Sequence, residues 1–142
     1  MTLRLLPDIN IWVAMHHRRH GHHTTAKAWF DGVDDGMLVF CRQTQLGFFR
    51  LLTNPAVMGE ETVTQKECWA IYENWIASGW AMMQSEPSGI DPAFRARTRA
   101  DEPATRIWMD AYLAAFSEAA GLTLVTFDRG LAARVRGAVV VG

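Results

Sequence analysis

The amino-acid sequence predicts an α/β fold, a three-layer α/β/α sandwich with a central parallel sheet. Short apolar runs of strand length alternate with longer segments in which apolar residues recur at helical spacing. Strands that alternate with helices form a parallel sheet covered on both faces. The 142 residues, of which 49% are hydrophobic and 20% charged, suit one globular domain with a real core. We therefore expect a single domain over residues 1–142.

The start of the chain predicts a strand, a short helix and a polar connection. Leu3–Leu6 is an apolar run stopped by Pro7, as expected for a buried strand. Asn10–Met15 predicts a helix that places its apolar residues on one side. The polar stretch His16–His23 holds all five histidines and predicts a hinge between this helix and the next.

The next segment predicts a helix, a strand and a second helix. Thr24 is the candidate N-cap of a helix whose apolar stripe ends before Gly36. Leu38–Cys41 is the second candidate strand. Thr44–Thr53 has helical spacing and is ended by Pro55, because the residue before a proline is disfavoured in a helix.

The centre of the chain begins with a strong helix signal. Thr64–Glu67 is a capping box, which predicts a helix that runs to Ser78. Trp80–Met83 is a third short strand. The polar segment 84–106 follows, with a candidate short helix over Pro92–Arg99.

The last third predicts a buried helix and the end of the sheet. Ile107–Ala120 is apolar almost all round, which indicates a helix buried in the core. Leu122–Thr126 predicts the fourth strand, Leu131–Val135 a helical turn, and Ala138–Val141 the last strand.

Composition excludes several classes of protein. The net charge of −1 gives no global attraction to nucleic acid or membrane, but 12 of the 14 basic residues are Arg, so local patches matter. Cys41 and Cys68 lack the spacing of a zinc site or disulfide framework, and we expect free thiols in a reducing cytoplasm. No apolar run is long enough for a membrane span, and the apolar run at the start of the sequence is too short for a signal peptide.

Three acidic residues are placed where a cation site is expected. Asp8 and Asp128 come just after predicted strands, and Asp110 lies early in the most apolar helix. In parallel sheets ligands bind beyond the carboxyl ends of the strands, and isolated carboxylates beside a core are costly to desolvate. Converging carboxylates suit Mg²⁺, and Asn10 and Thr126 are close enough in sequence to support them.

Each of these aspartates also has a plain structural reading. Asp8 and Asp128 taken singly fit turn or helix N-cap residues that follow a strand. Asp110 inside an apolar helix needs a partner, and a structural salt bridge to Arg106 is its alternative to a metal ligand. The set of three is a stronger signal than any one member.

The motifs together resemble those of PIN domains, and closely those of VapC-type toxins of bacterial toxin–antitoxin pairs. The resemblance runs from Leu5 to Val141 with the motifs in family order. It is carried by Asp8-x-Asn10, His22-His23 ahead of a helix with Trp29, Thr44-Gln45-Leu46-Gly47-Phe48-Phe49-Arg50-Leu51-Leu52-Thr53-Asn54-Pro55, Asp110-Ala111-Tyr112-Leu113 and Thr126-Phe127-Asp128-Arg129.

This resemblance implies a Mg²⁺- or Mn²⁺-dependent endoribonuclease that attacks an RNA phosphodiester in line with a metal-activated water. It implies that Asp8, Asp110 and Asp128 are the catalytic, metal-binding carboxylates. The family's remaining acid is normally a Glu in the third helix, where this chain has Gln45. A glutamine offers a carbonyl oxygen but no charge, so metal affinity should fall and activity could be reduced.

The resemblance also implies partners, namely an RNA substrate, a cognate antitoxin and a second copy in a homodimer. The candidate RNA contacts are in the first quarter of the chain, where a basic loop can bind phosphates or can equally be a solvated hinge. These candidates are Trp12, Arg18, Arg19, His22 and His23.

Two rival functions remain at the level of sequence. An aspartyl-phosphate phosphatase would also place Asp8 and Asn10 after a first strand, but it needs a late lysine to hold the phosphoryl group, and no lysine follows Lys66. A catalytically weakened PIN-like module that binds RNA or a protein partner is the second rival, and Gln45 is its best support.

Overall fold

The computed structural model describes residues 2–142, and Met1 lies outside the described residues. Within that range the strands form one sheet in the order β3-β2-β1-β4-β5, and every neighbouring pair is parallel. The strands are β1 (Leu3–Pro7), β2 (Gly36–Phe40), β3 (Ala81–Met83), β4 (Thr123–Thr126) and β5 (Val139–Val140).

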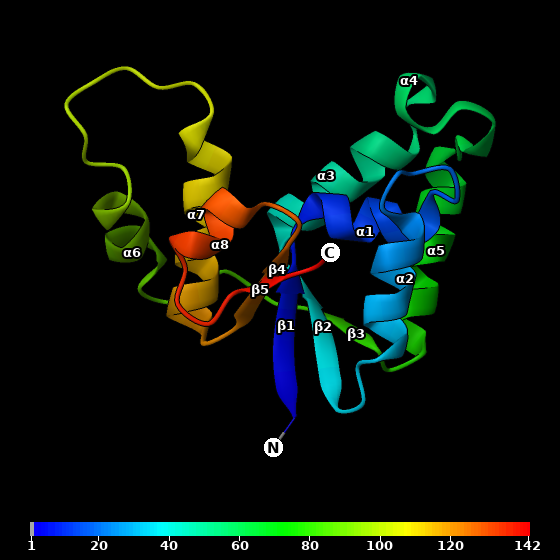
Figure 1. The fold of residues 1–142 in the computed structure, drawn as a ribbon, viewed down its shortest axis with the longest axis horizontal. Helices are drawn as coiled ribbons and strands as arrows, with labels where there is room; N and C mark the ends of the chain where they lie inside the picture. Colours follow the sequence, from blue (N-terminus) through cyan, green and yellow to red (C-terminus); the bar gives the residue numbers. More distant parts are fainter. Residues whose placement is uncertain (1) are drawn as a thin grey trace.

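Helices cover both faces of this sheet (Figure 1). On one side lie α1 (Ile9–His16), α2 (His23–Asp31), α3 (Arg42–Leu52) and α5 (Gln65–Ala77). On the other side lie α6 (Ile90–Ala96), α7 (Ile107–Ala120) and α8 (Arg129–Ala133). The short α4 (Pro55–Met58) and a 3-10 turn (Gly59–Glu61) connect α3 to α5. The predicted three-layer α/β/α fold is therefore confirmed.

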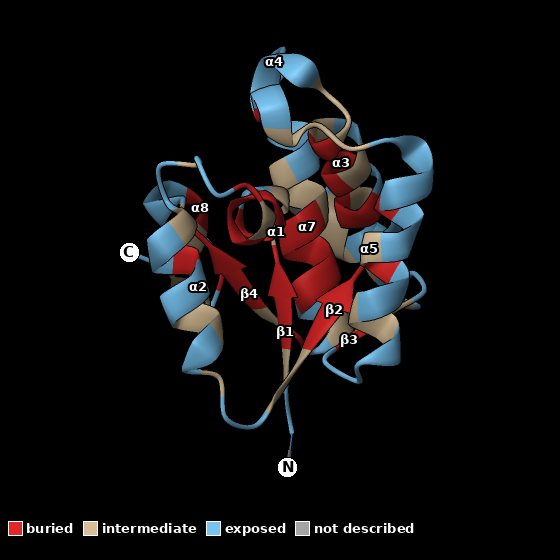
Figure 2. Cartoon of the chain, turned by 90° about the vertical axis from the view of Figure 1, so that its right-hand side faces the viewer, coloured by how far each residue is buried: buried red, intermediate tan, exposed pale blue. Residues whose placement is uncertain are grey.

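Successive residues of each strand face opposite layers, as the pleat of a strand requires. Leu5 and Val125 pack with the helices of the α1 side, whereas Leu6 and Leu124 pack with α7 and α8. All four side chains are buried. Figure 2 shows the carboxyl-terminal parts of β1, β2 and β4 as buried, and the starts of β1 and β2 as more exposed. A strand covered on both faces has to be apolar at every position, which is why these runs do not alternate in polarity.

Several element boundaries follow directly from capping chemistry. Thr64 accepts a hydrogen bond from the backbone N–H of Glu67, and the Glu67 carboxylate accepts one from the N–H of Thr64. This capping box starts α5 where the sequence predicts it. Asn54 caps α4 in the same way through the N–H of Ala56, and α7 ends at Gly121, whose φ of 68° suits glycine.

Three details of the sequence prediction are wrong. Thr24 does not cap α2, because the helix already begins at His23 and its N-cap is His22, which makes no side-chain cap bond. The helix predicted from Thr44 begins at Arg42, since Cys41 caps it and Thr44 is inside its first turn. The α4 helix was not predicted, because four residues between a proline and a glycine carry no periodic signal.

The helix α7 has the predicted bounds but not the predicted burial. Its first turn is exposed at Ile107, Trp108 and Met109, and its buried residues are confined to the stretch from Leu113 to Ser117. The apolar surface near its start is therefore open to a ligand or partner. Among residues 2–142, no helix has the length and apolar character needed to cross a bilayer.

Candidate active site at the carboxyl ends of β1 and β4

The strand order puts β1 between β2 and β4. The chain first builds the sheet on one side of β1, with β2 and β3, and then on the other side, with β4 and β5. Such a switch point is where open parallel sheets bind ligands, at the carboxyl ends of the strands. Asp8 directly follows β1, and Asp128 lies two residues after β4. The backbone N–H of Asp8 donates to the Val125 carbonyl at 2.9 Å, which fixes the two strand ends side by side.

The Asp8 carboxylate is held by three donors. Its Oδ1 accepts from the backbone N–H groups of Asn10 (3.1 Å) and Ile11 (3.3 Å), and its Oδ2 accepts from the Thr126 hydroxyl. Asp8 is thus the N-cap of α1, and Asn10 acts on it through its backbone rather than its side-chain amide. Burial raises the pKa of Asp8 and the charge of Asp110 adds to this, although the hydrogen bonds oppose the shift.

Thr126 connects the ends of the two strands. Its buried hydroxyl donates to Asp8 and accepts from the backbone N–H of Asp128 at 3.0 Å. Asp128 Oδ1 in turn accepts from the N–H of Leu131 at 3.0 Å, so Asp128 is the N-cap of α8. The cap reading of Asp128 is therefore correct, but the cap uses one oxygen only. Within residues 2–142 the other oxygen, Oδ2, receives no hydrogen bond.

Asp110 is the least constrained of the three aspartates. It lies half-buried in the first turn of α7, and no side chain of residues 2–142 forms an ion pair or hydrogen bond with its carboxylate. The salt bridge to Arg106 considered from sequence is not formed. Burial raises the pKa of Asp110 and the charge of Asp128 raises it further, while the Arg134 guanidinium opposes the shift. Asp110 therefore interacts electrostatically with both other aspartates.

Gln45 is buried in the first half of α3, and its side chain is already engaged. Arg42 Nη1 donates to Gln45 Oε1 at 2.5 Å. Gln43 Nε2 donates to the Met109 carbonyl at 3.3 Å and so ties the start of α3 to the residue before Asp110. The carbonyl oxygen that would replace the missing carboxylate thus already accepts a bond from a guanidinium.

The residues of the site suit a hard divalent cation in chemistry. The donors are carboxylate and hydroxyl oxygens, and burial raises the pKa of Asp8 and of Asp110, so a cation beside them would stabilise their ionised forms. Over residues 2–142, no three His, Cys, Asp or Glu side chains form a group that could hold a metal ion, so the predicted convergence of all three aspartates on one ion is not seen. Because Mg²⁺ keeps several waters when bound by proteins, one or two direct carboxylates are enough to hold it.

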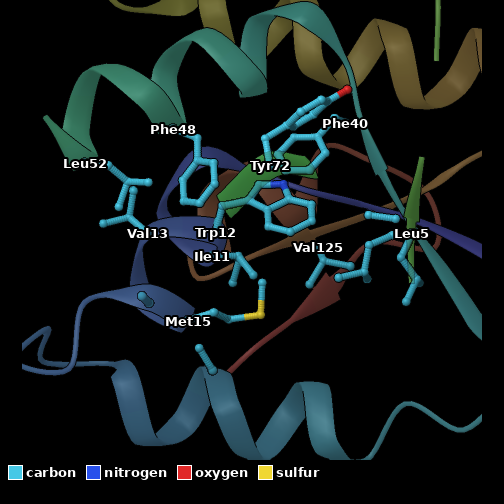
Figure 3. Close-up of a cluster of buried hydrophobic side chains, with 14 of the residues drawn as sticks. Leu5, Ile11, Trp12, Val13, Met15, Phe40, Phe48, Leu52, Tyr72 and Val125 are labelled. Carbon is cyan, nitrogen blue, oxygen red and sulfur yellow. The ribbon is translucent and has the colours of Figure 1, made fainter. Parts of the chain in front are cut away.

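Trp12, a candidate RNA contact from the sequence, lies in the core, which contradicts that role for it in this structure. Its side chain is 0% exposed. It stacks on Phe40 with ring centroids 3.9 Å apart and meets Trp75 edge-on at 5.2 Å. Figure 3 shows Trp12 inside the apolar cluster with Phe48 and Tyr72. The residue follows the acidic motif in sequence, but the turn of α1 directs its side chain into the core, against Phe40 at the end of β2.

The histidine and arginine loop is anchored by an acid that sequence reasoning missed. Glu61 accepts from His17 Nδ1 at 2.5 Å and from the backbone N–H groups of Arg18 and Arg19. Arg19 also pairs with Glu60. Arg18 and Arg19 nevertheless remain exposed. A glutamate in a polar turn gives no sequence signal for such a long-range contact.

The two remaining RNA-contact candidates differ in exposure. The ring of His22 is exposed and stacks on Phe127 at 4.6 Å, between the two site residues Thr126 and Asp128. His23 is turned inward, where its Nδ1 lies 2.6 Å from the Ala14 carbonyl. His22 is thus the better placed of the two.

A cleft of about 660 Å³ opens beside Asp110, and sequence reasoning missed its walls. It lies between α7, α8 and the segment before α7, and its lining includes Arg106, Trp108 and Arg134. The sequence singled out Arg106, but it did not single out Arg134. Only the packing of α8 against β4 brings Arg134 close to Asp110.

A three-layer domain with carboxylates at the switch point of a parallel sheet is the arrangement of a PIN domain. The PIN domain model matches residues 5–137, and the chain belongs to this family. The chain is 40% identical over 129 residues to Ribonuclease VapC41 of Mycobacterium tuberculosis, which covers 87% of this chain and 88% of that protein. The resemblance to VapC-type toxins is thereby confirmed.

Solved structures agree on the fold. The crystal structure of Mycobacterium tuberculosis VapC20, a Sarcin-Ricin loop cleaving toxin, superposes with a TM-score of 0.65 at 17% identity and covers 92% of this chain and 94% of its own. VapBC2 from Rickettsia felis, bound to a DNA fragment from its promoter, gives 0.62 at 8% identity and covers 97% of both chains.

Proposed function

We propose that this protein is the toxin of a type II toxin–antitoxin pair and an endoribonuclease that hydrolyses RNA phosphodiester bonds with Mg²⁺ or Mn²⁺. The family and the 40% identity to a VapC ribonuclease support the ribonuclease class. The observation that supports the metal dependence is geometric: Asp8 and Asp128 lie at the adjacent carboxyl ends of β1 and β4 and are joined through the Thr126 hydroxyl.

The three aspartates have different roles in this proposal. Asp8 is rigid, because two backbone N–H groups and the Thr126 hydroxyl fix both of its oxygens in direction. Asp128 offers the oxygen that its cap leaves free, and Asp110 can adjust its side chain because nothing in the described chain binds it. A bound divalent ion supplies Lewis-acid stabilisation of the phosphoryl oxygens and lowers the pKa of an attacking water. The protein contributes preorganised carboxylates that hold the charge in place.

The direct test is cleavage of RNA by the purified protein. We expect cleavage in Mg²⁺ or Mn²⁺, loss of cleavage in EDTA, and recovery when the ion is restored in excess. Gel analysis of a mixed-sequence single-stranded RNA measures this. Cleavage that continues at full rate in EDTA would rule out the metal-dependent mechanism.

A second candidate function is a binding module that holds RNA or a protein without cutting. Two observations favour it: Gln45 removes a negative charge, and its oxygen is already bonded to Arg42. RNA that is bound but uncut in Mg²⁺ and in Mn²⁺ would select this candidate over the nuclease.

Replacing Gln45 with Glu is expected to tighten Mn²⁺ binding by about 10-fold, because the charge of the ligand set governs affinity for hard cations. Arg42 limits the gain, since it would pair with the new carboxylate. Isothermal calorimetry of wild type and Gln45→Glu measures the change. Gln65→Glu, which adds the same charge at an exposed position at the start of α5, is the matched control. Equal affinities in all three proteins would place Gln45 outside the reach of the ion.

Partners are part of the proposal. A chain of the solved VapBC2 structure has the same fold as this chain, which supports a cognate antitoxin.

We also propose a homodimer through the exposed apolar residues Leu46 and Met109, whose helices are joined by the Gln43–Met109 bond. Light scattering should give twice the monomer mass for the wild type and the monomer mass for Leu46→Glu. A monomeric wild type at high concentration would remove the homodimer from the proposal.

A further inference from the structure

The cleft beside Asp110 extends from this member of the three aspartates towards α8 and the segment before α7. Its volume of about 660 Å³ is in the range of small-molecule and nucleotide sites. Asp110, Ala111 and Leu131 form its inner wall, and Arg106, Trp108 and Arg134 lie around it. Because Asp110 belongs to both, whatever occupies the cleft lies against the proposed catalytic centre.

The cleft presents two arginines that are free to bind an anion. Arg106 and Arg134 form no ion pair with any residue in the range 2–142. Arg97, in contrast, pairs with Glu118 and donates to the Arg134 carbonyl at 3.1 Å, so it secures the end of α8. The backbone of Arg134 is therefore held in place close to the proposed catalytic carboxylates. Its guanidinium is well suited to bind the RNA phosphate next to the one that is cleaved.

Trp108 supplies an aromatic face at the same cleft. The residue is 49% exposed in the first turn of α7, next to the exposed Ile107 and Met109. Its Nε1 donates to the Ala104 carbonyl at 3.1 Å, and its ring meets Phe94 edge-on at 6.3 Å. These contacts fix the position of the ring, and about half of the residue remains exposed, so a nucleic-acid base has aromatic surface on which to stack.

We propose that this cleft binds one nucleotide of single-stranded RNA next to the scissile phosphate, with its base on Trp108 and its phosphate on Arg134 and Arg106. The inference rests on the proposed ribonuclease function and specifies where the substrate chain runs. The joint presence of unpaired guanidinium groups and an open aromatic face favours a nucleotide over an acidic peptide, which would use the charges but not the ring.

The test is equilibrium binding of a labelled mixed-sequence single-stranded RNA in EDTA, measured by fluorescence anisotropy over a series of salt concentrations. Trp108→Ala should weaken binding about 5- to 150-fold and leave the salt dependence unchanged, because stacking carries no charge. Arg134→Gln should weaken binding and reduce the slope of log K against log[salt] by about 0.7, the value for one phosphate contact on a single strand.

Matched controls separate the cleft from general charge and exposed aromatic surface. Trp69→Ala removes a tryptophan that is 51% exposed on α5, and Arg50→Gln removes an exposed arginine from α3. Both should bind RNA as wild type does. Trp108→Phe keeps a stacking face and should recover most of the affinity lost in Trp108→Ala, which excludes a folding defect as the cause.

Each outcome decides the proposal. The nucleotide subsite is overturned if the cleft and control variants lose RNA affinity equally, or if the cleft variants lose no RNA affinity. If wild type still cleaves RNA in Mg²⁺ in that case, only the subsite is lost and the ribonuclease stands. Absence of wild-type cleavage is instead a failure of the proposed function. Cleft variants that lose binding of a poly-glutamate peptide but not of RNA would assign the cleft to a protein partner and also overturn it.

Discussion

Replacing Asp110 with Asn should reduce RNA cleavage by about 100-fold or more and leave the protein folded. The change removes one negative charge from the ion's ligand set, and losses of this size are usual when one preorganised electrostatic group is removed. Stability should be unchanged or higher, because burial and the charge of Asp128 both disfavour the ionised Asp110 in the fold. Single-turnover cleavage and thermal melting measure the two effects.

Asp91→Asn is the matched control, since Asp91 is exposed on α6 and pairs only with Arg95 across one helical turn. It should cleave RNA as wild type does. Expression in the host provides a second measurement, in which Asp110→Asn should no longer inhibit growth. Undiminished growth inhibition or cleavage by Asp110→Asn would remove this residue from the catalytic centre.

Asp8→Ala should also abolish cleavage and growth inhibition, but it reports two effects at once. Asp8 caps α1 and accepts three hydrogen bonds, so its loss costs about 1 kcal/mol of stability in addition to a ligand. Asp110 makes no such structural contact within residues 2–142. Asp110→Asn is therefore the sharper test of chemistry.

Trp12→Ala should lower the free energy of unfolding by about 3–5 kcal/mol, the usual cost of truncating a large buried aromatic residue. The indole fills the space between Phe40, Phe48 and Trp75, and no small residue can replace that volume. Trp12→Phe should cost less, because it also removes a buried indole N–H that has no hydrogen-bond partner in residues 2–142. Urea denaturation followed by circular dichroism measures these differences.

Trp69→Ala is the control for this experiment, because half of its side chain is exposed; its cost should be about 1 kcal/mol. The comparison also decides between the two roles considered for Trp12. Wild-type stability together with weaker RNA binding in Trp12→Ala would restore the substrate contact and contradict the buried position.

Local signals in the sequence predict much of the fold. The capping box at Thr64, the glycine after Ala120 and the apolar runs of the strands are each read from neighbouring residues, because hydrogen bonding at helix ends and side-chain alternation act over a few positions. The prediction that Thr24 is the N-cap of α2 is wrong because it, too, relied on neighbouring residues alone. Threonine fits an N-cap chemically, but the backbone enters the helix two residues earlier.

The candidate site was only partly predictable. Asp8 and Asp128 stand out because they follow apolar strands, and Asp110 because a charge interrupts an apolar helix. Arg134, Trp108 and Glu61 gave no such signal. An exposed arginine at the end of a short helix looks like any surface residue until the packing of that helix is known.

The sequence by itself determined which segments become strands or helices and which acids end them, since these depend on periodicity and on local hydrogen bonds. Only the tertiary structure decided the strand order β3-β2-β1-β4-β5, which joins Asp8 to Thr126 across 118 positions of the chain. It likewise decided that Trp12 is buried in the core and that Trp108 is partly exposed to solvent. Periodicity tells which face of an element is apolar, but the neighbour that covers that face is chosen by packing among all the elements together.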